Sequence, residues 1–66
     1  MKITINGEER ELPEGMTVAS LLSSLGAARS GIAVARNENV VRRSEYETLV
    51  IAAGDSVEII KAVAGG

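Results

Sequence analysis

The carboxyl terminus holds the residues best suited to chemistry, because the chain ends in Gly65-Gly66. The α-carboxyl group at the end of a chain ordinarily has a pKa of about 3.3 to 3.7. It is therefore an anion at neutral pH, and it can attack the α-phosphorus of ATP when another protein positions both groups. The resulting acyl-adenylate is a mixed anhydride from which a sulfur or amine nucleophile displaces AMP. The product is a thiocarboxylate, a thioester or an amide on Gly66.

Glycine suits such an end because it has no Cβ, so Gly65 and Gly66 fit a tunnel that excludes branched side chains. Residues 62–66 span at most ~17 Å when extended, which is enough to enter a catalytic cleft while the folded body stays outside. Ordering three such residues costs about 3 to 6 kcal/mol of backbone entropy. We therefore expect a flexible tail that is ordered by partner contacts elsewhere. The plainer alternative is a frayed terminus of small residues.

The residue types that are missing exclude several classes of function. The chain has 66 residues and contains no Cys and no His, so it has no catalytic triad, thiol nucleophile or imidazole base. It also lacks the glycine motifs that bind nucleotides. We expect that the chain is not an enzyme and that it binds no cofactor and no metal. A net charge of −2 and a single aromatic residue, Tyr46, disfavour nucleic-acid binding.

No part of the sequence approaches the roughly 20 apolar residues of a membrane span. The first six residues alternate polar and apolar side chains, unlike a signal peptide. We expect a cytoplasmic protein that contacts no membrane and is a monomer when free. The absence of cysteine fits a reducing compartment, although a cysteine-free chain is compatible with any compartment.

The first half of the chain predicts a hairpin followed by a helix. Ile3 and Ile5 indicate a strand that ends in an Asn6-Gly7 turn, and a charged edge strand over residues 8–12 follows. Thr17 is the predicted N-cap of this helix, and Gly26 is the predicted residue at its C-terminal end. Apolar residues recur between them with the spacing of one helix face: Val18, Leu21, Leu22 and Leu25.

The second half predicts strands over 32–35, 40–41, 49–51 and 56–63, with a loop or single helical turn at 44–47. A hairpin, one helix and a long last strand favour a mixed sheet in which the first and last strands lie parallel in the centre. This is an α+β, ubiquitin-like β-grasp fold with four to five strands and one main helix on one face. Residues 1–66 form a single domain. Ile60 and Ala62 would lie on the face without the helix, as a docking patch.

The remaining candidates have plain structural roles. Asn6-Gly7 is interpreted as a hairpin turn and nothing more, and Gly54-Asp55 as a turn that aims the last strand. Tyr46 is predicted to plug the core rather than to anchor an interface. Arg43 is a candidate contact for an acidic partner surface, against the alternative of an arginine in a solvated loop.

Three segments together resemble the sulfur carrier proteins of thiamine (thiazole) biosynthesis, in the ubiquitin-like β-grasp family, and the likeness covers essentially the whole chain. They are Val40-Val41-Arg42-Arg43-Ser44-Glu45-Tyr46, Gly54-Asp55-Ser56-Val57 and Ala62-Val63-Ala64-Gly65-Gly66. The resemblance implies that a ubiquitin-activating-like adenylyltransferase, which holds ATP, adenylates Gly66. A sulfur donor protein would then supply the sulfur of a thiocarboxylate, which would pass to a thiazole synthase. The residues expected to contact these partners are Ile60, Ala62, Val63, Ala64 and Arg43.

Other functions remain open from sequence alone. The segment Leu12-Pro13-Glu14-Gly15-Met16-Thr17-Val18 also resembles the opening of small regulatory β-grasp domains, which favours a binding module with a passive tail. The same activated end would serve a ubiquitin-like modifier that is joined to lysines. It would also serve a sulfur carrier for molybdopterin or cysteine.

Overall fold

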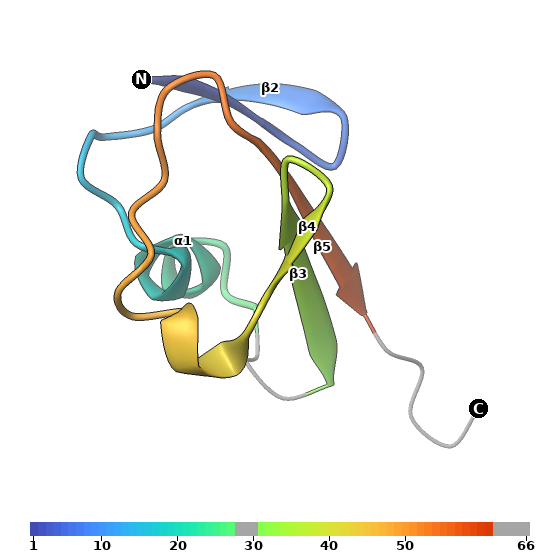
Figure 1. Ribbon diagram of the computed structural model, residues 1–66. Coiled ribbons are helices and arrows are strands. Elements are labelled where there is room, and N and C mark those ends of the chain that lie inside the picture. The colour runs from blue at the N-terminus through green and yellow to red at the C-terminus, as the bar shows by residue number, and fades with distance from the viewer. Residues whose placement is uncertain (28–30, 62–66) are drawn as a thin grey trace.

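The computed structural model describes residues 1–27 and 31–61, which form five strands, one α-helix and one short 3-10 helix (Figure 1). The predicted tail, and the end of the last strand expected at 62–63, lie outside the described residues. In chain order the elements are β1 (Lys2–Ile5), β2 (Glu8–Glu11), α1 (Val18–Ser24), β3 (Ile32–Arg36), β4 (Asn39–Val41), the short 3-10 helix η1 (Arg43–Glu45) and β5 (Ser56–Lys61).

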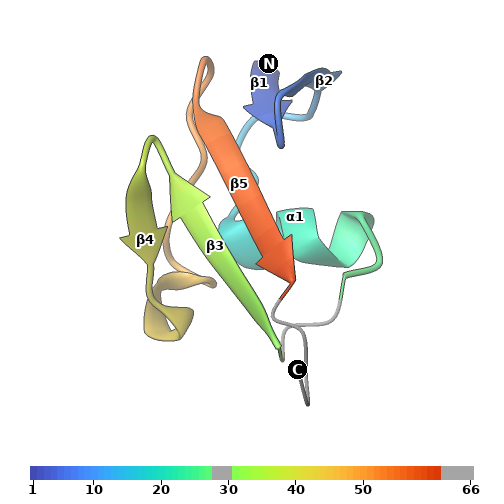
Figure 2. The ribbon, with the colours of Figure 1, turned by 90° about the vertical axis from the view of Figure 1, so that its right-hand side faces the viewer.

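All five strands form one sheet in the order β2-β1-β5-β3-β4. β5 lies at its centre, parallel to β1 and antiparallel to β3. Two antiparallel hairpins complete the sheet, β1 with β2 and β3 with β4. The helix α1 covers one face and leaves the other open, as the view of that open face in Figure 2 shows. The prediction of a β-grasp fold with a mixed sheet is confirmed.

Both hairpins close through two-residue turns with positive φ angles. Asn6 and Gly7 have φ angles of 51° and 83°, and Asn37 and Glu38 have 50° and 71°. Two consecutive left-handed residues define a type I′ turn, whose twist matches that of the flanking strands. Asparagine and glycine tolerate this conformation better than other residues do, which is why Asn6-Gly7 predicted the first turn correctly. In the second turn, Glu38 takes the place of the glycine.

The helix begins and ends as its sequence predicts. The Ser20 backbone N–H donates to Thr17 Oγ1 at 3.1 Å, which is the expected N-cap. At the other end Gly26 has a φ of 69°, and the Ala27 N–H donates to the Leu22 carbonyl at 2.9 Å. This bond belongs to a Schellman motif. Leu25 departs from the predicted apolar stripe, because as the C-cap it is 36% exposed.

An aliphatic core fills the space between α1 and the sheet. Tyr46 closes one side of it at 3% exposure, which confirms the predicted plug, and the Tyr46 carbonyl accepts a hydrogen bond from the Ala19 N–H at 2.7 Å. Burying each large aliphatic side chain contributes roughly 1.5 to 3 kcal/mol. The side chains at no more than 2% exposure are Ile3, Val18, Leu21, Leu22, Val34, Ile51 and Val57.

The strand predicted over residues 49–51 is wrong. Only one isolated bridge forms there, between Thr17 and Val50. The Ile51 N–H donates to the Met16 carbonyl at 2.8 Å, and the Leu49 carbonyl accepts from Val18 at 3.1 Å. This segment therefore pairs with the residues that lead into α1 rather than with the sheet. Its side chains alternate in burial as they would along a strand, which is why the sequence indicated one.

Candidate functional site

The central strand β5 is the element that leads to the predicted reactive end. It ends at Lys61, five residues before Gly66. On one side its residues pair with β3 from Val57 through Lys61, and on the other side its first two residues pair with β1. Gly65, Gly66 and the predicted contacts Ala62, Val63 and Ala64 lie outside the described residues.

A buried carboxylate anchors the start of β5. Asp55 is 8% exposed, and its Oδ2 accepts from the Ala52 N–H at 2.9 Å and lies 3.6 Å from Arg36 Nη1. Its Oδ1 accepts from Asn37 Nδ2 at 3.1 Å, and Asn37 Oδ1 in turn accepts from the Ser56 N–H at 2.9 Å. Asp55 thus joins the approach to β5, the β3–β4 turn and the first residue of β5. The sequence indicated only a turn here.

A second side chain holds β5 nearer to its end. Asn6 Oδ1 accepts from the Ile59 N–H at 2.8 Å, and Asn6 Nδ2 donates to the Ile59 carbonyl at 3.3 Å. The prediction that Asn6 forms a turn and nothing more is wrong. The residues are 53 positions apart, and no local pattern reveals a contact over that distance. The only signal in the sequence is the choice of asparagine where glycine also fits.

The open face of the sheet carries an apolar surface. Ile60 is 56% exposed and Val40 is 77% exposed. Ile60 pairs with Ala33, and Val40 pairs with Ala35, so the four side chains lie on neighbouring strands β5, β3 and β4. We call these four residues the open apolar patch. The predicted exposure of Ile60 on the face opposite α1 is confirmed, and the register adds three neighbours that the sequence did not single out.

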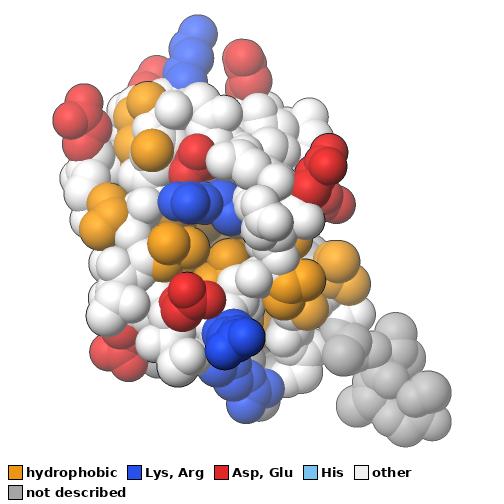
Figure 3. All heavy atoms as spheres, viewed as in Figure 1, with side chains coloured by type: hydrophobic (Ala, Val, Ile, Leu, Met, Phe, Trp, Pro, Cys, Tyr) orange, Lys and Arg blue, Asp and Glu red, His pale blue; other side chains and the backbone are white. Residues whose placement is uncertain are grey.

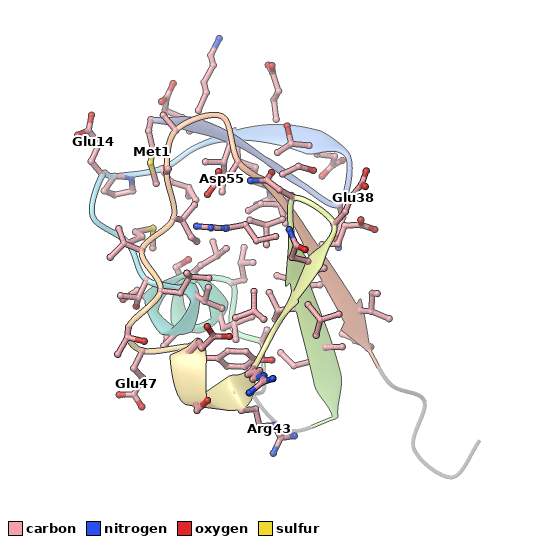
Figure 4. The ribbon with its side chains drawn as sticks, viewed as in Figure 1. Met1, Glu14, Glu38, Arg43, Glu47 and Asp55 are labelled. Atoms are coloured by element: carbon pink, nitrogen blue, oxygen red, sulfur yellow. The ribbon has the colours of Figure 1, made fainter. Side chains whose placement is uncertain are left out.

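The predicted contact Arg43 begins η1 and is exposed. It lies at the lower end of the molecule in Figure 4, where β5 also ends in Figure 1. Basic side chains gather at this lower end of the surface in Figure 3. Lys61, the last residue of β5, is exposed as well. Arg43 and Lys61 are thus both exposed, but η1 follows the edge strand β4, whereas Lys61 ends the central strand β5.

A surface hollow of about 580 Å³ lies along α1, away from β5, and is lined mainly by hydroxyl side chains. Three of these hydroxyls are engaged locally: Thr17 Oγ1 donates to Ser20 Oγ at 3.0 Å, and Ser24 Oγ donates to the Leu21 carbonyl at 2.8 Å. The hollow thus offers no unpartnered buried polar group to a ligand. Within residues 1–27 and 31–61, no group of three metal-ligating side chains occurs.

No helix in the described part of the chain has the length and apolar character needed to cross a membrane.

Comparison with known families decides which β-grasp proteins the chain is related to. The model of the ThiS family matches residues 3–66, which is nearly the whole chain. The chain belongs to the ThiS family. The resemblance to sulfur carriers of thiamine biosynthesis, drawn from the three sequence segments, is therefore confirmed.

Two members of the ThiS family match this chain from end to end. The protein named sulfur carrier protein ThiS from Escherichia coli is 30% identical over 66 residues, and the match covers 100% of both chains. The crystal structure of the thiamine biosynthesis protein ThiS from Geobacter metallireducens superposes with a TM-score of 0.87 at 30% identity, again over 100% of both chains.

The chain also matches part of a much longer protein. A protein named thiazole synthase from Paramagnetospirillum magneticum is 42% identical over all 66 residues. The chain spans only about a fifth of the length of that relative. A ThiS-like segment is thus present in proteins that bear the name of a thiazole synthase.

Proposed function

We propose that this chain is a sulfur carrier for thiazole formation in thiamine biosynthesis, and that the Gly66 carboxylate is the group that carries the sulfur. One observation carries the proposal. The ThiS family match runs to residue 66, so it includes Gly65-Gly66, which we predict from the sequence to be the reactive end. The full-length match to a protein named as a sulfur carrier supports the same function.

The chemistry follows from the carboxylate. One carboxylate oxygen of Gly66 attacks the α-phosphorus of ATP, and pyrophosphate leaves, so that an acyl-adenylate forms. A hydrosulfide released by a sulfur donor protein then attacks the carbonyl carbon, AMP leaves with its electron pair, and loss of the S–H proton leaves a thiocarboxylate on Gly66. The thiocarboxylate passes its sulfur to the thiazole precursor. The chain is a substrate in each step, and Gly65 is the slender residue that admits the end into each active site.

Two partners follow from this proposal. ATP must be held by an activating partner, a ubiquitin-activating-like adenylyltransferase, because the chain has no nucleotide-binding motif. A thiazole synthase is the proposed acceptor, supported by relatives of that name that contain a segment like this chain. Joining a carrier and its acceptor in one chain raises the effective concentration of each for the other. This gives a reason for a thiazole synthase to contain a segment like this chain.

The open apolar patch is the proposed docking surface for these partners, and Arg43 is a further candidate contact. Exposed aliphatic clusters with a polar surround are typical of protein interfaces. In the patch, Ile60 pairs with Ala33, and the carboxylate of Glu58 is exposed on the same face. Partner contacts here supply free energy that offsets the ordering of the tail.

Replacing Ile60 by aspartate (Ile60→Asp) is expected to raise the KM for the carrier in ATP-dependent activation by about tenfold or more, since it puts a charge into an apolar contact. The urea midpoint of unfolding is expected to change little, because Ile60 is 56% exposed. Val50→Asp is the matched control, at 52% exposure outside the patch. Equal KM values for the two variants would exclude the patch as the docking surface.

The direct test of the proposed function is intact mass spectrometry of the protein isolated from its native host. A species heavier by the mass difference between sulfur and oxygen is expected, and alkylation should place the modification on Gly66. A binding module with a passive tail would show only the unmodified mass. A modifier would instead appear joined to lysine through an isopeptide bond.

A further inference from the structure

The sheet is incomplete beside the second half of β5. The pairing of β1 with β5 stops at Ile5 and Val57, whereas β5 continues to Lys61. After Ile5 the chain turns back at Asn6-Gly7 into β2, which pairs with β1 on the far side from β5. Residues 58–61 are therefore paired with another strand on one side only, that of β3.

The hydrogen bonds of β5 show which of its backbone N–H and C=O groups face this gap. The Val57 carbonyl accepts from the Asn6 N–H at 2.9 Å, so the backbone groups of Val57 face β1. Because directions alternate along a strand, those of Ile59 also face the β1 side, and those of Glu58 and Ile60 face β3. Ile59 is thus the first residue of β5 with its backbone donor and acceptor directed into the gap.

The side chain of Asn6 fills that position. Its carboxamide has the same donor and acceptor as a peptide group, and it accepts from the Ile59 N–H at 2.8 Å and donates to the Ile59 carbonyl at 3.3 Å. Asn6 therefore acts as one additional residue of β1. It extends the parallel ladder past the point where the main chain turns away.

We propose that Asn6 is a positioning residue for the reactions of Gly66, a proposal that rests on the function proposed above. The bonds to Ile59 hold the last residues of β5 in the sheet, so that residues 62–66 start from a fixed point. When the end of the strand separates from the sheet, residues 59–61 no longer hold a fixed position relative to the docked body. The fraction of molecules ready to enter a partner's active site then falls, and the apparent affinity falls with it.

The conformation of the turn explains why asparagine carries this role. At a φ of 51°, glycine, asparagine and aspartate are the well-tolerated residues. Glycine offers no side chain. Aspartate at neutral pH accepts from the Ile59 N–H but cannot donate to its carbonyl. Asparagine alone meets both requirements at once.

The chain contains a matched control for testing Asn6. Asn37 is also the first residue of a type I′ turn, with a φ of 50°, and its side chain also bonds to β5. It holds the start of the strand, because Asn37 Oδ1 accepts from the Ser56 N–H at 2.9 Å. Asn6→Gly and Asn37→Gly thus remove the same amide from similar turn conformations. The first amide bonds to Ile59 in the second half of β5, and the second bonds to Ser56 at its start and to Asp55 just before it.

The first measurement is amide hydrogen exchange by NMR on the full chain, and it does not depend on the proposed function. Asn6→Gly is expected to speed exchange of the Ile60 amide, which faces β3, by about tenfold relative to the Val34 amide. Asn37→Gly is expected to leave the ratio of these two rates unchanged. A wild-type ratio in Asn6→Gly would overturn the proposal.

The second measurement is ATP-dependent activation by the cognate adenylating enzyme. Asn6→Gly is expected to raise the KM for the carrier about fivefold with kcat within twofold, and Asn6→Asp to fall between Asn6→Gly and the wild type. Asn37→Gly should keep the wild-type KM at a temperature where it is folded. If the wild type is activated and Asn6→Gly matches it, the positioning role is wrong. If the wild type is not activated at all, the proposed function fails instead.

Discussion

Deleting Gly66 is expected to abolish ATP-dependent activation of the chain while its folded body stays intact. The deletion withdraws the carboxylate by one residue, about 3.3 to 3.6 Å. A displacement of roughly 1 Å from the reacting geometry already costs about a hundredfold in rate, so activation should fall by more than about a thousandfold. The measurement is pyrophosphate release by the adenylating enzyme. The urea midpoint should not change, because the core side chains lie between Ile3 and Val57.

A chain with one extra glycine after Gly66 is the control for this deletion. It keeps every native residue and moves the carboxylate by the same distance in the opposite direction. The same loss of activation is expected, because the reaction depends on where the carboxylate lies relative to ATP and not on which residues the chain contains. Wild-type activation of either variant would contradict the assignment of Gly66. A binding module with a passive tail would tolerate both changes in all its interactions.

Replacing Asp55 by alanine is expected to lower the free energy of unfolding by about 2 to 4 kcal/mol. The change removes the acceptor for the Ala52 N–H and for the Asn37 amide, and it leaves Arg36 without its carboxylate. A domain of this size is stable by only about 3 to 10 kcal/mol. Urea denaturation followed by circular dichroism should therefore show a large fall in the midpoint.

Glu58→Ala is the control for Asp55→Ala, since it removes an exposed carboxylate from β5 itself. Its midpoint should stay close to that of the wild type, as is usual for exposed substitutions. Asp55→Asn, which keeps the size and one acceptor oxygen, should fall between the two. Equal midpoints for Asp55→Ala and Glu58→Ala would show that the buried hydrogen bonds of Asp55 make no net contribution to the free energy of unfolding.

Local signals were sufficient to predict most of the fold. Turn residues with positive φ, the cap at Thr17 and the glycine that closes α1 each act within a few residues of themselves. Alternation along β5 placed Ile60 on the open face, and the order of the elements indicated the mixed sheet. The strand predicted over 49–51 failed because its alternating burial comes from packing beside the residues that lead into α1.

Individual side-chain contacts between distant segments could not be predicted. Asn6 meets Ile59 across 53 positions, and Asn37 meets Asp55 across 18 positions. A polar residue in a turn looks the same in sequence whether its side chain faces solvent or another strand. The partners of Ile60 in the open apolar patch likewise require the register of β3 against β4 and β5. The reactive end stays a prediction from composition and position, because residues 62–66 lie outside the described residues.

The parallel arrangement of β1 and β5 has a mechanical consequence. A force that pulls on the end of β5 against the start of β1 acts along both strands, so it shears the bonds between them. The pairs Thr4–Ser56 and Ile5–Val57 and the two bonds from Asn6 to Ile59 then resist the force together instead of opening one after another. An enzyme that pulls on the chain beyond Lys61 would therefore have to break these bonds together before the folded body opened.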